Sequence, residues 1–413
     1  MKDKLSIGLI SYRSNPYCGG QGVYIRNLSR ELSKLGHSVE VIAGPPDPLL
    51  INGVKLTMLD CLDLYNPDDL FRVPSIRELT DPVNVMEWLG VSTMGYPEPF
   101  TFGLRAYRYL RKRKKQFDII HDNQCLSYGL LGIKKDFPTI ATIHHPISID
   151  RQIALDSVRS WWKKLKHRRW YSFIGMQKRV SRRLDKIITV SESSKKDICN
   201  DFKIKPENFA IVPNGIDTDV FYPKTDVEKD PDRIIVTNSA DTALKGLYYL
   251  LQALKLIESK RKIKLTVIGT PKKNGGIEKL VKDLNISHLI DFTGRIDDER
   301  FVYEYAKASI AVVPSVYEGF GLPVGEAMAC GIPVITTNGG ALSEVAGDAA
   351  VVVPTKSPEK LAEAIINLLD DKAEMERLGK AGYKRVMENF TWKRAAERTV
   401  EVYREAINDY SKI

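Results

Sequence analysis

Residues 314–334 read PSVYEGFGLPVGEAMACGIPV, and this stretch decides the fold that we predict. The apolar residues 309–313 before it predict a buried strand of a parallel sheet. Two glycines of the EGFGL segment follow in a turn, where the backbone can approach a ligand closely. Pro323 suits the first turn of a helix, and Gly331 suits its C-terminal end. The stretch therefore predicts a strand, a loop and a helix in succession.

Two carboxylates, Glu318 and Glu326, stand eight positions apart in this stretch. We expect Glu318 in the loop and Glu326 in the first turn of the helix. Ligands of open α/β sheets bind at the carboxyl ends of the strands, and a helix N-terminus there favours anions. A carboxylate can accept hydrogen bonds from both hydroxyls of a ribose or from two hydroxyls of a hexose. The spacing indicates a nucleoside-diphosphate site, although acidic residues also favour a helix N-terminus for electrostatic reasons alone.

The whole string EGFGLPVGEAMACGIPVI is more specific than the two carboxylates, and it resembles the E-x7-E signature of the retaining glycosyltransferases of family 4. Other family motifs recur along nearly the whole chain. They are GG at 19–20, IHH at 143–145, PNGID at 213–217, KG at 245–246 and NGG at 338–340.

The resemblance implies a fold class and a domain organisation. We expect an α/β protein with the GT-B fold, in which two Rossmann-like, doubly wound parallel-sheet domains face each other across a cleft. Residues 1–222 would form the acceptor-side domain and residues 223–390 the domain that binds the nucleotide-sugar donor. Residues 391–413 would form a C-terminal helix that crosses back to the first domain. The alternation of strand and helix patterns along the sequence agrees with parallel sheets.

The resemblance also assigns site residues. His144, Lys245 and Glu318 are the candidate catalytic residues, with His145 as the second choice for the histidine. Lys245 would act as a point charge on the diphosphate, Glu318 would touch the transferred sugar, and Glu326 would bind the ribose. The candidate donor-binding residues are Gly19, Gly20, Asn214, Lys245, Arg295, Ile296, Glu318, Gly319, Phe320, Gly321, Leu322 and Glu326. A tight turn would also explain the Gly19–Gly20 pair, and turn formation would explain Asn214.

One family feature is missing. The family has a Gly-Arg pair five or six residues before the lysine, and this chain has Ser239 and Ala240 there. The missing cation implies either weaker binding of the diphosphate or a substitute elsewhere. Arg295, in the TGRI segment at the end of a predicted strand, is our candidate for the substitute.

The function implied by the resemblance is transfer of a hexose from a nucleotide-sugar to an acceptor, with retention at the anomeric carbon. We expect a UDP- or GDP-sugar as donor, no metal site and no further cofactor. The acceptor would be a glycan, either lipid-linked or part of the cell envelope. Two alternatives stay open: a nucleotide-sugar epimerase or hydrolase of the same fold, and a non-catalytic, membrane-associated binding protein.

Composition agrees with a cytoplasmic enzyme. A chain of 413 residues has room for two domains, and its 43% hydrophobic content is ordinary for a globular protein. The N-terminal sequence MKDKLSIGLISY enters a strand pattern directly and does not resemble a signal peptide. The five cysteines are scattered and have no C-x-x-C spacing, which favours reduced thiols over a disulfide framework or a zinc site.

The net charge of +10 belongs to the first half of the chain. Residues 1–225 hold 35 basic and 24 acidic residues, whereas residues 226–413 hold 27 and 28. Recognition motifs for nucleic acid do not accompany the basic surplus, so we expect no nucleic-acid partner. Residues 159–184 predict one amphipathic, basic helix with a row of aromatic and aliphatic residues (Trp162, Leu165, Phe173, Val180 and Leu184). Such a helix either lies on an anionic membrane or packs its apolar face on the sheet.

Residues 60–103 have no clear periodicity and many Pro, Asp and aromatic residues. We expect a short helix and irregular loops there, on the acceptor side, followed by a basic helix over 104–115.

Overall fold

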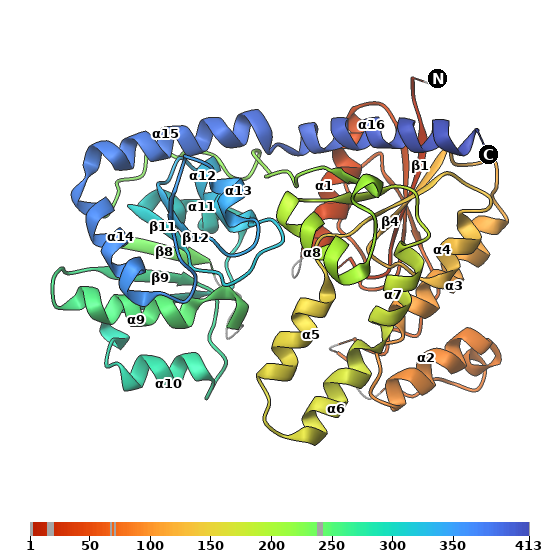
Figure 1. The fold of residues 1–413 in the computed structure, drawn as a ribbon, viewed down its shortest axis with the longest axis horizontal. Coiled ribbons are helices and arrows are strands. Elements are labelled where there is room, and N and C mark those ends of the chain that lie inside the picture. The colour runs from red at the N-terminus through yellow and green to blue at the C-terminus, as the bar shows by residue number, and fades with distance from the viewer. Residues whose placement is uncertain (1–2, 15–19, 67, 70–71, 238–242, 413) are drawn as a thin grey trace. The chain divides into compact units, whose positions relative to one another are not determined.

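A computed structural model describes residues 3–14, 20–66, 68–69, 72–237 and 243–412. The chain divides into two compact units. The first unit comprises residues Met1–Val190, Ser194–Val212 and Ala395–Ile413, and the second comprises Ser191–Ser193 and Pro213–Arg394. Each unit is built on one parallel sheet (Figure 1). The prediction of two doubly wound α/β domains is confirmed.

The first unit contains a sheet of seven strands in the order β3-β2-β1-β4-β5-β6-β7. These strands are β1 (Ser6–Ser11), β2 (Ser38–Ala43), β3 (Lys55–Met58), β4 (Ile119–Asn123), β5 (Thr139–Thr142), β6 (Ile187–Thr189) and β7 (Phe209–Ile211). Ile7 of β1 lies between Val39 of β2 and Ile119 of β4. Because both faces of this part of the sheet are covered, every residue of β4 and all but the first residue of β1 are buried, including the polar His121, Asp122 and Asn123.

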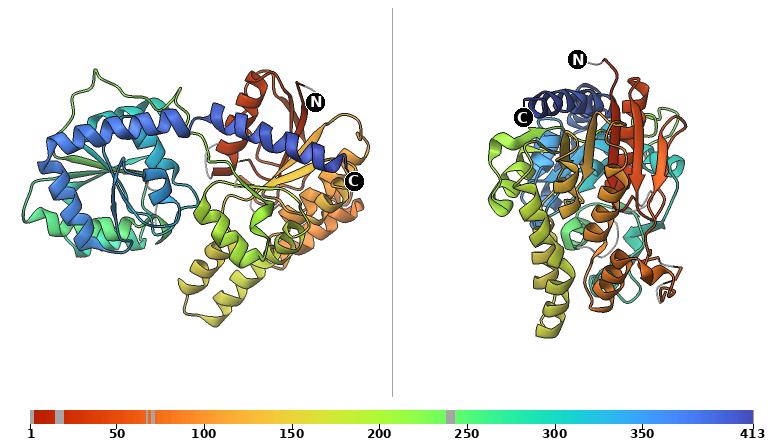
Figure 2. Two further views of the ribbon diagram at one scale, coloured as in Figure 1. Left: turned by 45° about the horizontal axis from the view of Figure 1, so that its top comes forward. Right: turned by 90° about the vertical axis from the view of Figure 1, so that its right-hand side faces the viewer.

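The helices of the first unit surround this sheet, except the pair at residues 147–170, which projects away from it (Figure 2). They are α1 (Gly20–Lys34), α2 (Pro82–Ser92), α3 (Glu98–Arg111), α4 (Tyr128–Ile133), α5 (Ile147–Asp156), α6 (Trp161–Trp170), α7 (Ile174–Ser181) and α8 (Glu192–Phe202). The stretch 60–103 contains a short helix, α2, among loops, as expected, but the basic helix predicted over 104–115 is α3 and begins earlier, at Glu98.

The single helix predicted over 159–184 is wrong, because the 3-10 turn Tyr171–Phe173 separates α6 from α7. Phe173, Val180 and Leu184 are buried in the core of the first unit. Trp162 and Leu165 of α6 are each 47% exposed. The five residues therefore do not form one stripe: the second half packs on the sheet, and the first half faces solvent.

The second unit contains six parallel strands in the order β10-β9-β8-β11-β12-β13. They are β8 (Arg233–Thr237), β9 (Lys264–Ile268), β10 (Ile290–Gly294), β11 (Ile310–Val313), β12 (Val334–Thr337) and β13 (Val351–Val353). The helices are α9 (Leu247–Glu258), α10 (Gly276–Asp283), α11 (Asp298–Lys307), α12 (Leu322–Ala329), α13 (Leu342–Ala346), α14 (Pro358–Asp370) and α15 (Lys372–Asn389). The core of this unit includes Ile234, Leu250 and Val312.

The stretch 314–334 folds as predicted, with β11 before the loop, α12 after it, and Gly331 at a positive φ of 69° just past the helix. One detail is wrong. Helix α12 begins at Leu322, so Glu326 lies in its second turn instead of its first.

The last helix, α16 (Trp392–Tyr410), contributes its residues from Ala395 onward to the first unit. Tyr403 is fully buried there, and its hydroxyl lies 2.7 Å from Nδ1 of His121 on β4. Lys186 adds an ion pair to Glu405 at 2.8 Å. None of the helices formed by the described residues combines the length and apolar character needed to cross a bilayer.

Candidate active site

Lys245 and Glu318 meet at the carboxyl edge of the second sheet. Lys245 follows β8 and Glu318 follows β11, the two adjacent strands at which the strand order reverses. Such a switch point is where open α/β sheets bind ligands. Nζ of Lys245 lies 2.7 Å from Oε1 of Glu318, and the Ser315 hydroxyl donates to the same oxygen at 2.9 Å. Both charged side chains keep some exposure, so the pair faces outward from the sheet edge.

Two glycines allow this close approach. Gly246 has a φ of 68°, and a Cβ on it would lie 1.9 Å from the carbonyl oxygen of Pro314. Gly340 has a φ of 64°, and a Cβ there would lie 2.2 Å from the carbonyl oxygen of Glu318. That carbonyl accepts a hydrogen bond from the Ala341 amide at 2.9 Å. The KG and NGG motifs thus place the backbone on both sides of the Glu318 loop.

Glu326 is half-buried in α12, near both members of the pair. Burial raises the pKa of its carboxyl to about 7, Lys245 lowers it, and Asp298 and Glu318 raise it further. Its carboxyl oxygens can accept hydrogen bonds from ligand hydroxyls, which is the ribose role that the family implies.

Glu326→Gln is expected to stabilise the unliganded protein and to weaken donor binding. The folded-state pKa of about 7 exceeds the ordinary value of 4.5, so Glu326 costs stability progressively as pH rises from 4.5 to 7. The variant escapes this cost and should gain on the order of 1–2 kcal/mol above pH 7 but nothing below pH 4.5. Donor affinity should fall about 10-fold with the loss of a charged acceptor. Thermal unfolding across pH and donor titration would check both, and a pH-independent stability difference would contradict the assignment.

The residues after Glu318 contribute either to the core of the second unit or to the start of α12. The Phe320 side chain is 5% exposed and packs edge-on against Phe390 at 5.6 Å, so it belongs to the core of the second unit. With its side chain buried, Phe320 would contact a ligand through its backbone amide. Gly321 is the N-terminal cap of α12, and Leu322 is its first residue. Together with Gly319, they place amide groups at a helix N-terminus, which suits a phosphate.

Asn214 lies in the loop that enters the second unit. It is 9% exposed, and its Oδ1 atom accepts no hydrogen bond from the residues that the structure describes. A buried acceptor without a partner is unfavourable, so this atom is suited to a ligand hydroxyl or a water. Ile216, two residues on, packs against Gly325 of α12 and keeps the loop beside the helix.

Arg295 and Ile296 follow β10, at the edge of the same sheet. The Arg295 side chain is exposed, and β10 is separated from β8 by one strand. Ser239 and Ala240, which replace the family's Gly-Arg pair, lie outside the described residues.

If Arg295 supplies the missing cation, Arg295→Ala should raise the KM for donor about 10-fold, the effect of one hydrogen bond to a charged group. The turnover number should change less, because an interaction shared by ground and transition states affects binding alone. Initial rates at varied donor concentration separate the two constants. An unchanged KM would refute the substitution.

His144 lies two residues past the end of β5 in the first unit and is half-buried. Its Nε2 atom is 2.9 Å from Oδ1 of Asn123, which ends β4. The side-chain oxygen of Gln124 accepts from the His144 amide at 2.8 Å, and the Tyr24 ring meets the imidazole edge-on at 4.7 Å. Burial lowers the pKa of His144 to about 3, so the ring is neutral at physiological pH. His145 turns to Asp150 instead, at 2.8 Å.

Asn123 and Gln124 contact the candidate histidine His144, and sequence reasoning missed both. Asn123 Nδ2 donates to the Gln21 carbonyl at 3.4 Å and to Ser11 at 3.3 Å, which joins β4 to the start of α1. Gln124 has a positive φ of 56°, unusual for a residue with a side chain. The polar residues HDNQ at 121–124, where the strand β4 ends, could have indicated these positions in the sequence.

Of the glycine pair, Gly19 lies outside the described residues and Gly20 is the first residue of α1. Among the described residues, no atom lies within 4 Å of the position that a Cβ would take on Gly20. Sequence reasoning also missed Arg13, just after β1, whose guanidinium contacts Glu98 at 3.1 Å. Burial raises the pKa of Glu98 to about 7, and Arg13 and Tyr96 lower it.

Comparison with known proteins gives a family match for each half of the chain. The family model described as "Glycosyltransferase Family 4" matches residues 18–220, and the model "Glycosyl transferases group 1" matches residues 221–385. A curated relative, the MMP alpha-(1->4)-mannosyltransferase of Mycolicibacterium hassiacum, is 44% identical over 408 residues, which cover 98% of each chain. The chain belongs to glycosyltransferase family 4. It is a glycosyltransferase, as predicted.

Other relatives and solved structures are similar to nearly the whole chain. A D-inositol 3-phosphate glycosyltransferase of Corynebacterium urealyticum is 26% identical over 97% of this chain and 95% of its own. The sucrose-phosphate synthase of Thermosynechococcus elongatus has a TM-score of 0.74 at 25% identity, covering 98% of this chain and 100% of that one. HepE of Anabaena, solved with UDP, shares the fold at 14% identity, with a TM-score of 0.67 over 97% of this chain and 100% of its own. The GT-B fold is confirmed, and these comparisons do not favour the epimerase, hydrolase or binding-protein alternatives.

Proposed function

We propose that this family 4 enzyme is a retaining α-mannosyltransferase that uses a nucleoside-diphosphate mannose, with GDP-mannose tested first. The 44% identical relative is named for α-(1→4) mannosyl transfer. The single structural observation that supports the chemistry is the Lys245–Glu318 pair at the switch point of the second sheet. Nucleotide-linked mannose has the α configuration, so an α-linked product corresponds to retention.

The reaction replaces one bond at the anomeric carbon. The bond between that carbon and the phosphate oxygen breaks, and a bond to an acceptor hydroxyl oxygen forms on the same face. The acceptor proton passes to the departing phosphate oxygen. We propose that the Lys245 ammonium and the amides at the start of α12 stabilise the charge on the leaving diphosphate. Glu318 holds hydroxyls of the sugar, and Glu326 holds the ribose.

His144 is proposed to contact the transferred sugar. Because its imidazole is neutral, the ring nitrogen not bonded to Asn123 can accept a hydrogen bond from a sugar hydroxyl. We further propose that catalysis is independent of metal, since a lysine and helix amides supply the positive charge that a divalent cation supplies elsewhere.

The acceptor is proposed to be a mannose-containing glycan, either lipid-linked or free. We also propose that the enzyme works in the cytoplasm, at the inner face of the membrane. The free thiols of Cys61, Cys125, Cys199 and Cys330 agree with a reducing compartment.

The test is a matrix of donors and acceptors. GDP-mannose, UDP-glucose and ADP-glucose are each offered with short α-mannosides, with and without EDTA, and products are identified by NMR of the anomeric proton. We expect α-linked product from GDP-mannose that survives EDTA. If only another donor gives product, the assignment of mannose as the transferred sugar is wrong. A β-linked product would refute retention, and loss of activity in EDTA would refute metal independence. Release of nucleotide without any acceptor would point back to a hydrolase.

A further inference from the structure

Helix α2 has an unusual distribution of polarity. Two of its eleven residues, Val83 and Glu87, are buried, whereas Met86 is 49% and Leu89 is 54% exposed. A surface helix ordinarily buries its apolar side chains and exposes its charges. Here a carboxylate faces inward, and methionine and leucine face solvent.

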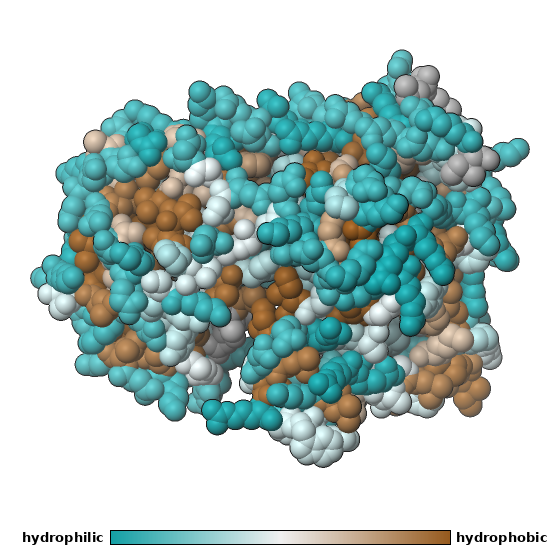
Figure 3. Space-filling model, viewed as in Figure 1, coloured by the Kyte–Doolittle hydropathy of each residue, from teal (hydrophilic) through white to brown (hydrophobic). Residues whose placement is uncertain are grey.

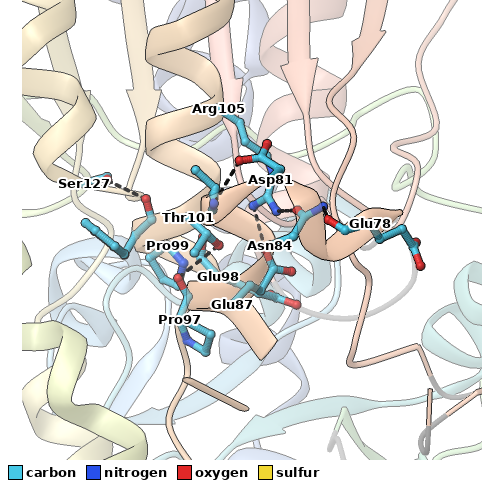
Figure 4. Close-up of polar contacts among 12 residues, drawn as sticks. Glu78, Asp81, Asn84, Glu87, Pro97, Glu98, Pro99, Thr101, Arg105 and Ser127 are labelled. Carbon is cyan, nitrogen blue, oxygen red and sulfur yellow. Dashed lines mark hydrogen bonds and ion pairs between the residues drawn. The ribbon is translucent and has the colours of Figure 1, made fainter. Parts of the chain in front are cut away.

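The inward carboxylate is held firmly. Glu87 is 2% exposed and forms an ion pair with Arg105 of α3, which is 7% exposed and also donates to Asn84 of α2 (Figure 4). Breaking a buried pair of this kind is costly, because it leaves an uncompensated charge. The orientation of α2 is therefore locked, and its outer apolar face is a fixed feature of the first unit.

Helix α6 adds to this face. No residue of α6, all of which the structure describes, is buried, and Trp161 and Trp162 are 74% and 47% exposed. The end of α6 is attached to the segment after α2: Arg169 donates to Thr93 at 2.7 Å, and Trp170 stacks on Tyr96 with ring centroids 4.9 Å apart. Residues 159–170 contain six basic and no acidic residues.

The α2–α6 surface comprises the exposed side chains of Met86, Leu89, Met94, Trp161, Trp162, Lys163, Leu165, Lys166 and Arg168. In Figure 3 brown surface lies at the lower right, where Figure 1 places α2, and pale surface lies at the bottom, where Figure 1 places α6, with hydrophilic surface between the two. Large apolar side chains that gather in exposed positions on neighbouring elements are typical of interaction sites.

We propose that the α2–α6 surface docks this glycosyltransferase on an anionic lipid bilayer. Apolar side chains beside a helix rich in Lys and Arg, with tryptophans between them, match the chemistry of an anionic membrane interface. A second copy of the chain is a poor occupant, because a symmetric contact would oppose two strongly basic helices. The proposal rests on the peripheral location proposed above and assigns its surface.

The full-length enzyme is sedimented with phosphatidylcholine vesicles that contain or lack phosphatidylglycerol. We expect binding to the anionic vesicles only, weakened by salt. Lys163→Glu/Lys166→Glu should lower the partition coefficient at least 30-fold, since each basic residue contributes about a 5-fold factor. Met86→Ser/Leu89→Ser should also lower it about 10-fold or more without any change of charge. The control Lys260→Glu/Lys262→Glu carries the same charge change on exposed lysines of the second unit and should bind normally.

Each other outcome overturns the proposal. Equal binding with and without phosphatidylglycerol would exclude charge recognition. Binding that needs the lysines but not Met86 and Leu89 would exclude α2 from the surface. A dimer in solution that the serine variant dissociates would assign the face to a second copy. Transfer to a water-soluble acceptor without vesicles should be equal in all variants, so a failure of docking is distinguishable from a failure of the enzyme.

Discussion

Replacing Lys245 with alanine is expected to lower kcat/KM by about 100- to 1,000-fold, the range for removing one preorganised group that stabilises developing charge. The ammonium is the charge proposed for the leaving diphosphate, and it also lies 2.7 Å from the Glu318 carboxylate. Without it, Glu318 keeps the Ser315 hydroxyl as its described polar partner on Oε1. The effect should appear mainly in kcat, because negative charge on the phosphate grows as the glycosidic bond breaks. Initial-rate kinetics with the best donor measures it.

The control for this variant is Lys255→Ala, an exposed lysine on α9 that pairs with Glu258 at 2.7 Å. It should retain full activity. The double variant Lys245→Ala/Glu318→Gln tests whether the pair acts as a unit: its loss should be smaller than the product of the two single losses. A Lys245→Ala enzyme with activity near that of the parent would remove Lys245 from the mechanism.

Asn123→Asp is expected to make the reaction sensitive to acid and to lower kcat/KM about 10- to 100-fold at mildly acidic pH, the scale of one disturbed buried hydrogen bond. The Nδ2 atom of Asn123 faces the Gln21 carbonyl, which can only accept, so Oδ1 faces His144. Nε2 of His144 must then donate, which leaves the lone pair on Nδ1. A carboxylate at position 123 would favour the imidazolium and raise the pKa of His144 from about 3 toward neutrality.

The measurement is the pH profile of kcat/KM, with ¹⁵N spectra of the histidine side chains as a direct readout of the tautomer. The parent should show no titration of His144 above about pH 5, because its folded pKa is far below that value. Asn389→Asp makes the same chemical change at the end of α15 and should leave the profile unchanged. A parent spectrum with the proton on Nδ1, or identical profiles for parent and variant, would disprove the positioning role of Asn123.

Sequence patterns located the strand, loop and helix around Glu318 closely. Strand β11, helix α12 and the positive φ of Gly331 lie where we predicted them, because apolar runs, Gly and Pro encode these elements locally. The first unit was less predictable. Helix α2 turns Glu87 toward Arg105, eighteen positions along the chain, and such an inverted helix has no periodic signature. The break between α6 and α7 was missed because basic and aromatic residues continue through it.

The sequence by itself determined the alternation of strands and helices, the two parallel sheets and the loop that carries Glu318, since these depend on short-range chemistry. The tertiary structure alone decided which distant residues meet. Lys245 and Glu318 are 73 positions apart, and they pair because crossover connections bring β8 and β11 side by side. It likewise decided that Asn123 orients His144 and that α2 exposes its apolar face. Contacts between segments far apart in the chain control all three, and no local pattern contains them.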